Sequence, residues 1–414
     1  MSKDSKLEKW LIENNWCSMP FTHINIDTNG NALTCCKGDP IINKETDQPL
    51  NIKDMSLEEI WNHPDRIEIE DYFVKGKRHP ACWKCWREND QKYANRIKFS
   101  MMEGNKRLSQ MVMDSPGYRP RNKRPRSLEI RPGNICNLKC RICTYWASTS
   151  WAKDAHALWY QHIPNYKDTP IAKYNREAQW FDEDRIWEDA ETLKDVEFIH
   201  FLGGEPMMAH KHFTLLDKVS KIADPKNIHV KYNTNATIMP TMEQIEILQR
   251  FRQVSVGCSI DDMGPRFEYQ RKNGNWEEVV KNIDTFLTFT KHIYIDCTIS
   301  VLNGYYIDEF FNWCDDRGWQ NKPDPDHFVA QPGLDLRSLS PKEKEFFLKK
   351  LQTGTNYRTK YVIDYMMNED RYNDEAQDMR YKFIKHCDEI RSENFFDVCP
   401  DLKGVMNLEP TWKK

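Results

Sequence analysis

The chain has 414 residues, of which 39% are apolar and 30% charged, and its formal net charge is −3. This composition predicts two or three globular domains and excludes a fibrous or low-complexity protein. The small net charge provides no overall attraction to nucleic acid or to a membrane surface. The N-terminal sequence is too charged for a signal peptide, and no stretch approaches the ~18 apolar residues of a membrane-spanning helix. We therefore expect a cytoplasmic protein.

The chain contains 13 cysteines, and most of them lie in groups. Five precede residue 86, three lie between 136 and 143, and five are scattered from Cys258 onward. Because the cytoplasm keeps thiols reduced, grouped cysteines indicate metal or iron–sulfur ligation rather than disulfides. The scattered Cys258, Cys297 and Cys314 lie in or beside apolar runs and are most simply small buried residues.

The first elements expected along the chain are a hairpin and a short helix. Ile24 and Ile26 alternate with polar residues before Asn29-Gly30, a pattern that predicts a β-hairpin. Ser56 is a suitable helix N-cap and is followed by an acidic first turn, so a helix is expected to begin there.

A linker is expected to separate this region from the rest of the chain. Residues 91–113 have a polar helical pattern, and the Pro- and Arg-rich stretch 114–126 follows. The basic run of this stretch could contact a phosphate backbone, although a solvated linker is the simpler interpretation. We therefore assign residues 1–113 to a small cysteine-rich α+β domain and 114–126 to an interdomain linker.

Strands alternate with helices after residue 126. The expected strands cover 127–133, 196–204, 228–236, 253–261, 292–300 and 326–331, and the helices between them include 241–251 and 275–291. This alternation predicts an α/β core of parallel βα units over 127–335, as an open sheet or a partial barrel. Residues 336–414 are expected to form a helical C-terminal region.

Four polar motifs each follow one of these predicted strands. They are the cysteine stretch and the sequences GGEP, NTNA and SIDD. In parallel α/β folds the active groups gather at the carboxyl ends of the strands. We therefore expect the four motifs to lie on one rim of the core.

The cysteine stretch has the spacing Cys136-x3-Cys140-x2-Cys143. Thiolates in one short loop suit an iron–sulfur cluster or zinc. Zinc needs a fourth ligand, and the next histidine, His156, lies in a helical context that matches poorly. Three thiolates on a four-iron cluster leave one iron open to a substrate or cofactor.

A second group of possible ligands lies near the N-terminus. Cys82 and Cys85 form a chelating pair, and Cys17 and the Cys35-Cys36 doublet precede them. Together they provide four ligands with one cysteine left over. A closed iron–sulfur cluster and a four-cysteine zinc ribbon are both compatible with this set.

The sequence CNLKCRIC after the first core strand resembles the signature of the radical S-adenosylmethionine (radical SAM) superfamily. The companion motifs follow in the same order, including YNTNAT, SIDD and the later Arg271. Two positions depart from the pattern: Ala236 replaces a usual glycine, and Ile142 replaces a usual aromatic residue. The resemblance implies that S-adenosylmethionine is bound by Gly203, Gly204, Glu205, Asn233, Asn235, Ser259, Asp261 and Arg271.

The resemblance implies a partial (β/α)6 barrel with a 4Fe–4S cluster on Cys136, Cys140 and Cys143 as the catalytic centre. Such enzymes reductively cleave S-adenosylmethionine to a 5′-deoxyadenosyl radical, which abstracts hydrogen from the substrate. The N-terminal segment resembles the auxiliary-cluster domains called SPASM and twitch, which usually follow the barrel. It implies a second iron–sulfur cluster, expected to be 4Fe–4S, on Cys17, Cys35, Cys82 and Cys85.

Relatives with such domains frequently modify peptides or proteins, so a peptide or protein is the expected substrate. The expected electron donor is a flavodoxin or a ferredoxin, and neither membrane nor nucleic-acid binding is expected. RNA, nucleoside or small-molecule modification by the same chemistry is the alternative. A non-catalytic zinc-binding interaction protein is the alternative from another class.

Overall fold

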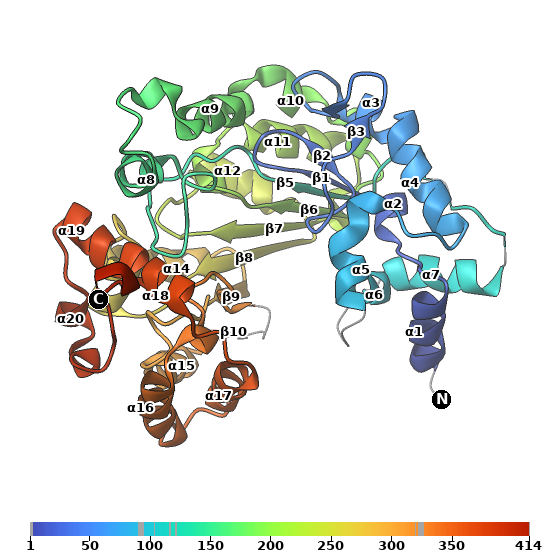
Figure 1. Cartoon of the computed structure of the whole chain (residues 1–414). Helices are drawn as coiled ribbons and strands as arrows, with labels where there is room; N and C mark the ends of the chain where they lie inside the picture. The colour runs from blue at the N-terminus through green and yellow to red at the C-terminus, as the bar shows by residue number, and fades with distance from the viewer. Residues whose placement is uncertain are drawn as a thin grey trace. The chain divides into compact units, whose positions relative to one another are not determined.

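The computed structural model describes residues 3–89, 95–102, 104–115, 117–120, 122–318, 320–321 and 327–413 (Figure 1). The chain folds into two compact units, each built from segments that are distant in sequence. The first unit comprises Met1–Gly133, Glu177–Lys231 and Thr241–Val254; the second comprises Asn134–Arg176, Tyr232–Pro240 and Ser255–Lys414. Within the described ranges, no helix has both the length and the apolar character needed to cross a membrane.

The first unit contains the predicted hairpin, formed by β1 (His23–Ile26) and β2 (Ala32–Leu33). Its β1 also pairs in parallel with β5 (Ser127–Ile130), which in turn pairs in parallel with β6 (Phe198–Phe201). Figure 1 shows β1 beside β5. The N-terminal cysteine-rich segment therefore contributes a strand to the same sheet as the first strands of the α/β core.

Burial alternates along β5 and β6. Leu128 and Ile130 of β5 are fully buried, whereas Glu129 between them is half-buried, and β6 repeats this pattern around His200. Successive side chains of a strand point to opposite faces. The sheet of the first unit thus has an apolar face and a face that carries polar side chains.

The helix expected from Ser56 is α3 (Leu57–Trp61), which begins with a capping box between Ser56 and Glu59. The helical pattern over 91–113 corresponds to α6 (Asn95–Met101) and α7 (Asn105–Asp114), and residues 91–94 and 103 lie outside the described residues. The other elements of the first unit are α1 (Lys3–Glu13), α2 (Met19–Thr22), β3 (Ile42–Asn43), β4 (Gln48–Pro49), α4 (Pro64–Val74), α5 (Trp83–Asn89), α6 (Asn95–Met101), α7 (Asn105–Asp114), α10 (Asp184–Glu188), α11 (His212–Ile222) and α12 (Met242–Leu248).

The second unit contains the later strands. The chain passes from one unit to the other within β7 (His229–Thr234) and within β8 (Gln253–Ser259). Parallel pairing then joins β8 to β9 (His292–Asp296) and β9 to β10 (Gln320–Asn321). The helices are α8 (Ala152–Trp159), α9 (Pro170–Glu177), α13 (Gly264–Gln270), α14 (Trp276–Phe286), α15 (Ile307–Asp316), α16 (Pro341–Gln352), α17 (Thr359–Asn368), α18 (Asp374–Tyr381), α19 (Cys387–Arg391) and α20 (Phe395–Val398).

These pairings give an α/β fold with a mostly parallel sheet. The strand expected over 326–331 is wrong. In the described part of that range only Phe328 pairs, as a single parallel bridge with Ile299. Pro332 follows at a turn and has no N–H to extend a ladder. The short β10 takes the place beside β9 instead.

Gly133, at the start of the cysteine loop, has a φ of +69°, and an added Cβ would lie 2.3 Å from the Phe181 ring and 2.4 Å from the Ala178 carbonyl oxygen. Gly133→Ala should therefore lower the thermal unfolding midpoint strongly. Gly318→Ala is the matched control, because its φ is +68° but no atom lies within 4 Å of the added Cβ. The control should lose only the about 1–2 kcal/mol of a left-handed alanine. Equal midpoints for the two variants would contradict this steric account.

Candidate functional site

The three-cysteine loop follows β5 and belongs to the second unit. Cys136 and Cys140 are buried and Cys143 is half-buried, and all three pack around Leu138. The Cys136 sulfur accepts a hydrogen bond from the Leu138 N–H at 3.4 Å. Burial, with a contribution from the Cys140 thiol, raises the pKa of Cys143 to about 12. A metal that binds here must therefore displace thiol protons.

The NTNA turn after β7 holds the N-terminal part of this loop. Asn235 donates from Nδ2 to Asn137 Oδ1 at 3.0 Å, and Asn137 donates in turn to Thr237 Oγ1 at 2.8 Å. The same Nδ2 lies 3.7 Å from the Cys136 sulfur. Asn235 thus positions the cysteine loop. Asn233 donates instead to Asp296 on β9.

The C-terminal part of the loop pairs with the backbone after α13. The N–H groups of Lys139 and Arg141 donate to carbonyl oxygens of residues 270–272, at 3.1 and 2.7 Å. Arg271 therefore lies beside Cys140, with its Nη1 3.9 Å from the sulfur. Sequence reasoning did not anticipate this pairing, because no local pattern links two segments 130 residues apart.

Arg271 is buried together with Asp261, and their Nε and Oδ2 atoms form an ion pair at 2.9 Å. The second Asp261 oxygen accepts the Thr298 N–H at 2.9 Å. Burial alone would lower the pKa of Arg271, but Asp261 and Cys140 raise it above its ordinary value. The guanidinium is thus a permanent cation beside a cysteine. Ser259 ends β8, half-buried and in register with Asp296.

The GGEP motif belongs to the first unit and follows β6. Gly203 has a φ of +122°, and a Cβ there would lie 3.1 Å from the Cβ of Arg131. A side chain at Gly203 would therefore be crowded by Arg131, the residue that follows β5. Gly204 is half-buried. Glu205 is 1% exposed, and its Oε1 accepts the Met207 N–H at 3.0 Å.

The N-terminal cysteines meet in the first unit. Cys17, Cys35, Cys82 and Cys85 are buried, form no disulfide and line one small cavity with apolar walls. Burial raises the pKa of Cys17 well above its ordinary value, and the other three thiols raise it further. Four converging thiols suit the closed shell of an iron–sulfur cluster. Among the described residues, no three or more His, Cys, Asp or Glu side chains are placed so that they could hold a single metal ion.

Cys36, the second cysteine of the doublet, does not line this cavity. It is exposed, and the charged side chains that act on it are Glu129, Arg131 and Lys37. Cys35 instead lines the cavity with the other cysteines. The geometry therefore distinguishes two neighbours that the sequence could not separate.

Glu129 and Arg131 belong to a polar cluster on the sheet of the first unit. Glu129 Oε1 accepts from Asn25 Nδ2 at 2.6 Å and from Arg131 Nη2 at 2.8 Å. Burial alone would raise the pKa of Glu129, but His200 and Arg131 lower it to about 2. Sequence reasoning missed this cluster. The available signal was the period-two polar residues in otherwise apolar strands.

His23 extends the polar cluster. Its Nδ1 lies 2.7 Å from Ser127 Oγ, and that hydroxyl donates to the Thr22 carbonyl at 3.4 Å. Nδ1 therefore carries the proton, which leaves Nε2 as an acceptor. Nε2 is buried and has no hydrogen-bond partner among the described residues. Burial lowers the pKa of His23 to about 4, so the ring is neutral at pH 7.

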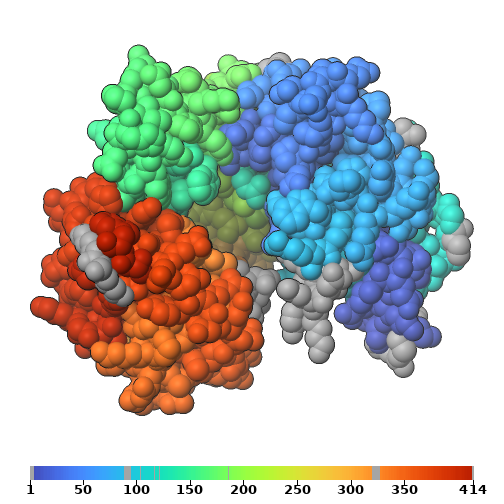
Figure 2. Space-filling model, viewed as in Figure 1, coloured from blue at the N-terminus to red at the C-terminus, as the bar shows by residue number. Residues whose placement is uncertain are grey.

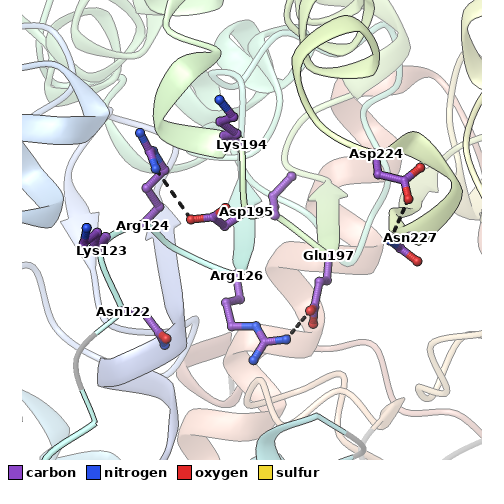
Figure 3. A pocket seen from close by; sticks show the side chains of 10 residues that line it. Asn122, Lys123, Arg124, Arg126, Lys194, Asp195, Glu197, Asp224 and Asn227 are labelled. Carbon is purple, nitrogen blue, oxygen red and sulfur yellow. Dashed lines mark hydrogen bonds and ion pairs between the residues drawn. The ribbon is translucent and has the colours of Figure 1, made fainter.

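The basic linker lines a pocket of about 370 Å³ in the first unit, shown in Figure 3. Two of its cations, both arginines, form ion pairs. Arg124 pairs with Asp195 at 3.6 Å, and Arg126 pairs with Glu197. The negative partners reduce the attraction that this pocket offers to a phosphate backbone.

Comparison with known protein families agrees with this arrangement of cysteines. Residues 130–310 match the radical SAM superfamily, and residues 17–86 match the SPASM iron–sulfur cluster-binding domain. The chain therefore contains a segment that matches the SPASM domain ahead of a segment that matches the radical SAM superfamily. These two matches imply a 4Fe–4S cluster, S-adenosylmethionine and an additional iron–sulfur cluster as cofactors.

No curated protein matches the chain. Among solved structures, anSMEcpe with bound AdoMet and Cp18Cys peptide is 16% identical, with a TM-score of 0.35 and coverage of 65% of this chain and 62% of that one. In its AdoMet-bound structure, the chain spans 53% of anSMEcpe. SuiB of Streptococcus suis is 16% identical, with a TM-score of 0.34 and coverage of 86% and 71%.

Ala236, which replaces the usual glycine of the NTNG-like turn, is fully buried with a φ of +59°. Ala236→Gly should change the free energy of unfolding by no more than about 1 kcal/mol, because relief of strain offsets the lost methyl burial. Ala236→Val should lower the unfolding midpoint and the iron content, since a β-branched side chain is strongly disfavoured at this φ. Equal iron content and midpoint for Val and Gly would show that the turn does not hold the cysteine loop.

Proposed function

We propose that Cys136, Cys140 and Cys143 hold the 4Fe–4S cluster at which S-adenosylmethionine is reductively cleaved, and that hydrogen is then abstracted from a peptide or protein. The observation that carries this proposal is the pairing of the cysteine loop with residues 270–272, which places a buried cation beside the thiols. S-adenosylmethionine on the open iron supplies 5′-deoxyadenosyl radical chemistry.

The chain's own residues bind and orient this cofactor. Asp261 holds the Nε edge of Arg271, and Nη1 lies 3.9 Å from the Cys140 sulfur, so the Nη edge would meet the methionyl carboxylate beside Cys140. Ser259 provides a hydroxyl for ribose. On the family pattern, the GGEP turn binds the methionyl amine, with Glu205 as an acceptor. Burial of Arg271 excludes water and strengthens its interaction with a carboxylate.

Cys17, Cys35, Cys82 and Cys85 are proposed to hold the second cluster. All four positions of a cubane would then be occupied by thiolates, so substrate would not bind to its iron. The apolar walls of the cavity exclude water from the cluster. Its role in this proposal is electron transfer.

A peptide is the favoured substrate because of the polar cluster in the first unit. The charges of Glu129 and Arg131 cancel, and His23 is neutral, so the cluster offers no surplus cation for phosphate. Arg131 offers N–H donors and His23 an acceptor. A peptide amide presents the complementary carbonyl and N–H. Modification of RNA, a nucleoside or a small molecule is the second candidate, and the paired arginines of the linker pocket count against the nucleic acid.

The reaction is proposed to take place in the reducing cytoplasm, with a flavodoxin or a ferredoxin as the electron donor. None of the 13 cysteines forms a disulfide, which suits that compartment. The interpretation as a non-catalytic zinc protein is set aside, because both cysteine groups fall within matched iron–sulfur families.

The protein purified without oxygen should release 5′-deoxyadenosine and methionine when it is reduced with dithionite in the presence of S-adenosylmethionine. Replacement of Cys136, Cys140 and Cys143 by Ala should abolish this release, because the loop would no longer hold iron. Product analysis by chromatography measures the outcome. An iron-loaded, reduced wild-type protein that never forms 5′-deoxyadenosine would refute the catalytic proposal.

Adjacent cysteines provide a matched test of the second site. Wild-type protein should contain about eight irons per chain if both sites hold cubanes. Cys35→Ala should lose about half of the iron, because Cys35 lines the cavity. Cys36→Ala should keep all of it, because that thiol is exposed and does not line the cavity. Iron and sulfide assays decide the matter, and the reverse result would make Cys36 the ligand.

A further inference from the structure

Arg141 lies in the cysteine loop, directly after Cys140, and its side chain is fully buried. Burial of an unpaired guanidinium is costly, so its partners are informative. The side chain has five N–H donors. Five hydrogen bonds use them: Nε to Tyr269 O at 3.2 Å, Nη1 to Phe383 O and Ile384 O at 3.1 and 3.3 Å, and Nη2 to Asp388 and Glu393 at 2.5 and 2.7 Å.

Four of these five bonds go to the C-terminal segment 382–393. Two acceptors are carbonyls of the π-helical turn Lys382–His386, which interrupts the helix between α18 and α19. A π-turn displaces carbonyls from the regular helical ladder, and such turns are common at functional sites. The irregular turn therefore presents two acceptors to Arg141 that a continuous helix would use internally.

The same segment is also connected, through Asp154, to Lys139, the residue before Cys140. Asp154 of α8 accepts from Lys139 Nζ at 3.0 Å and from Arg391 Nε at 2.7 Å. Figure 2 shows the red C-terminal residues against the green residues that include α8. The carbonyl of Cys140 itself accepts the Trp151 indole N–H at 2.7 Å, and Arg391 lies over that ring at 4.7 Å.

We propose that segment 382–393 is a positioning element of the radical SAM centre, which fixes Cys140 through Arg141 and sets the charge around the cluster through Asp388 and Glu393. This inference rests on the proposed role of Cys140 as a cluster ligand. Lys139, Cys140 and Arg141 are each tied to this segment or to a side chain that it contacts. Displacement of the segment would therefore move one of three ligands.

The charges make the proposal measurable. Asp388 and Glu393 both contact Arg141, and Lys272 also pairs with Glu393 at 2.8 Å. Neutralising one carboxylate leaves the buried network more positive. A more positive surrounding raises the reduction potential of an iron–sulfur cluster. Glu393→Gln and Asp388→Asn keep the shape and change the charge.

The test uses anaerobically prepared full-length holoenzyme. Redox titration followed by electron paramagnetic resonance should give a higher midpoint potential for the 4Fe–4S signal that responds to S-adenosylmethionine in Glu393→Gln and Asp388→Asn. Glu389→Gln is the matched control, because Glu389 lies on the same α19 but is exposed. Its potential and its spectrum should equal those of the wild type.

Arg141→Met should lose cluster affinity by about 10- to 100-fold, as expected when a ligand's supporting contacts are removed. Arg141→Lys should recover part of that loss, because it keeps the charge but has fewer donors. If the Arg141 variants do not fold, the potentials of the two carboxylate variants still test the proposal. The proposal would be overturned if both carboxylate variants had the same potential and the same spectrum as the Glu389→Gln control. Full iron content in Cys140→Ala would instead refute the ligand assignment on which it rests.

Discussion

The pairing of the cysteine loop with residues 270–272 is the interaction on which the second unit's site depends. Two backbone hydrogen bonds flank Cys140, one from the residue before it and one from the residue after it. They place Arg271 beside the Cys140 sulfur. Asp261 pairs with the guanidinium, and the Asn235 turn holds the other end of the loop. These side-chain contacts add to the two backbone hydrogen bonds around Cys140.

The parallel pairing of β1 with β5 plays the corresponding role in the first unit. A SPASM-like segment placed before the core needs a way to join it, and a parallel strand supplies one. This pairing aligns Asn25 with Glu129, and Glu129 aligns with His200 on β6. The three side chains therefore share one face and bury a charge that none of them could bury alone.

Sequence reasoning recovered the parts of the fold that depend on local patterns. The hairpin around Asn29-Gly30, the capped helix at Ser56 and the first five core strands have short-range signals, and all of them form. The prediction of a strand over 326–331 was wrong. Its apolar pattern is short, and Pro332, which has no N–H to donate to a ladder, follows it directly. Periodicity also could not show that β1 would join the core sheet, since pairing partners are set by tertiary packing.

The candidate site likewise has parts that local sequence patterns predict and parts that depend on distant contacts. Cysteine spacing identified both groups of thiols, because a short loop that converges on one cluster leaves its trace in the sequence. Arg141 was invisible despite standing between two of those cysteines. Its role depends on hydrogen-bond acceptors that come more than 240 residues later in the chain, at Phe383 and Asp388. A buried cation is recognised only when its acceptors are known.

The Cys35-Cys36 doublet lies between the cysteine-lined cavity and the polar cluster of the first unit. Neighbouring side chains diverge, so one thiol enters the apolar cavity while the next lies near Glu129 and Arg131. A single peptide unit thus joins the auxiliary cysteines to the polar cluster, and the GGEP turn packs on the same Arg131.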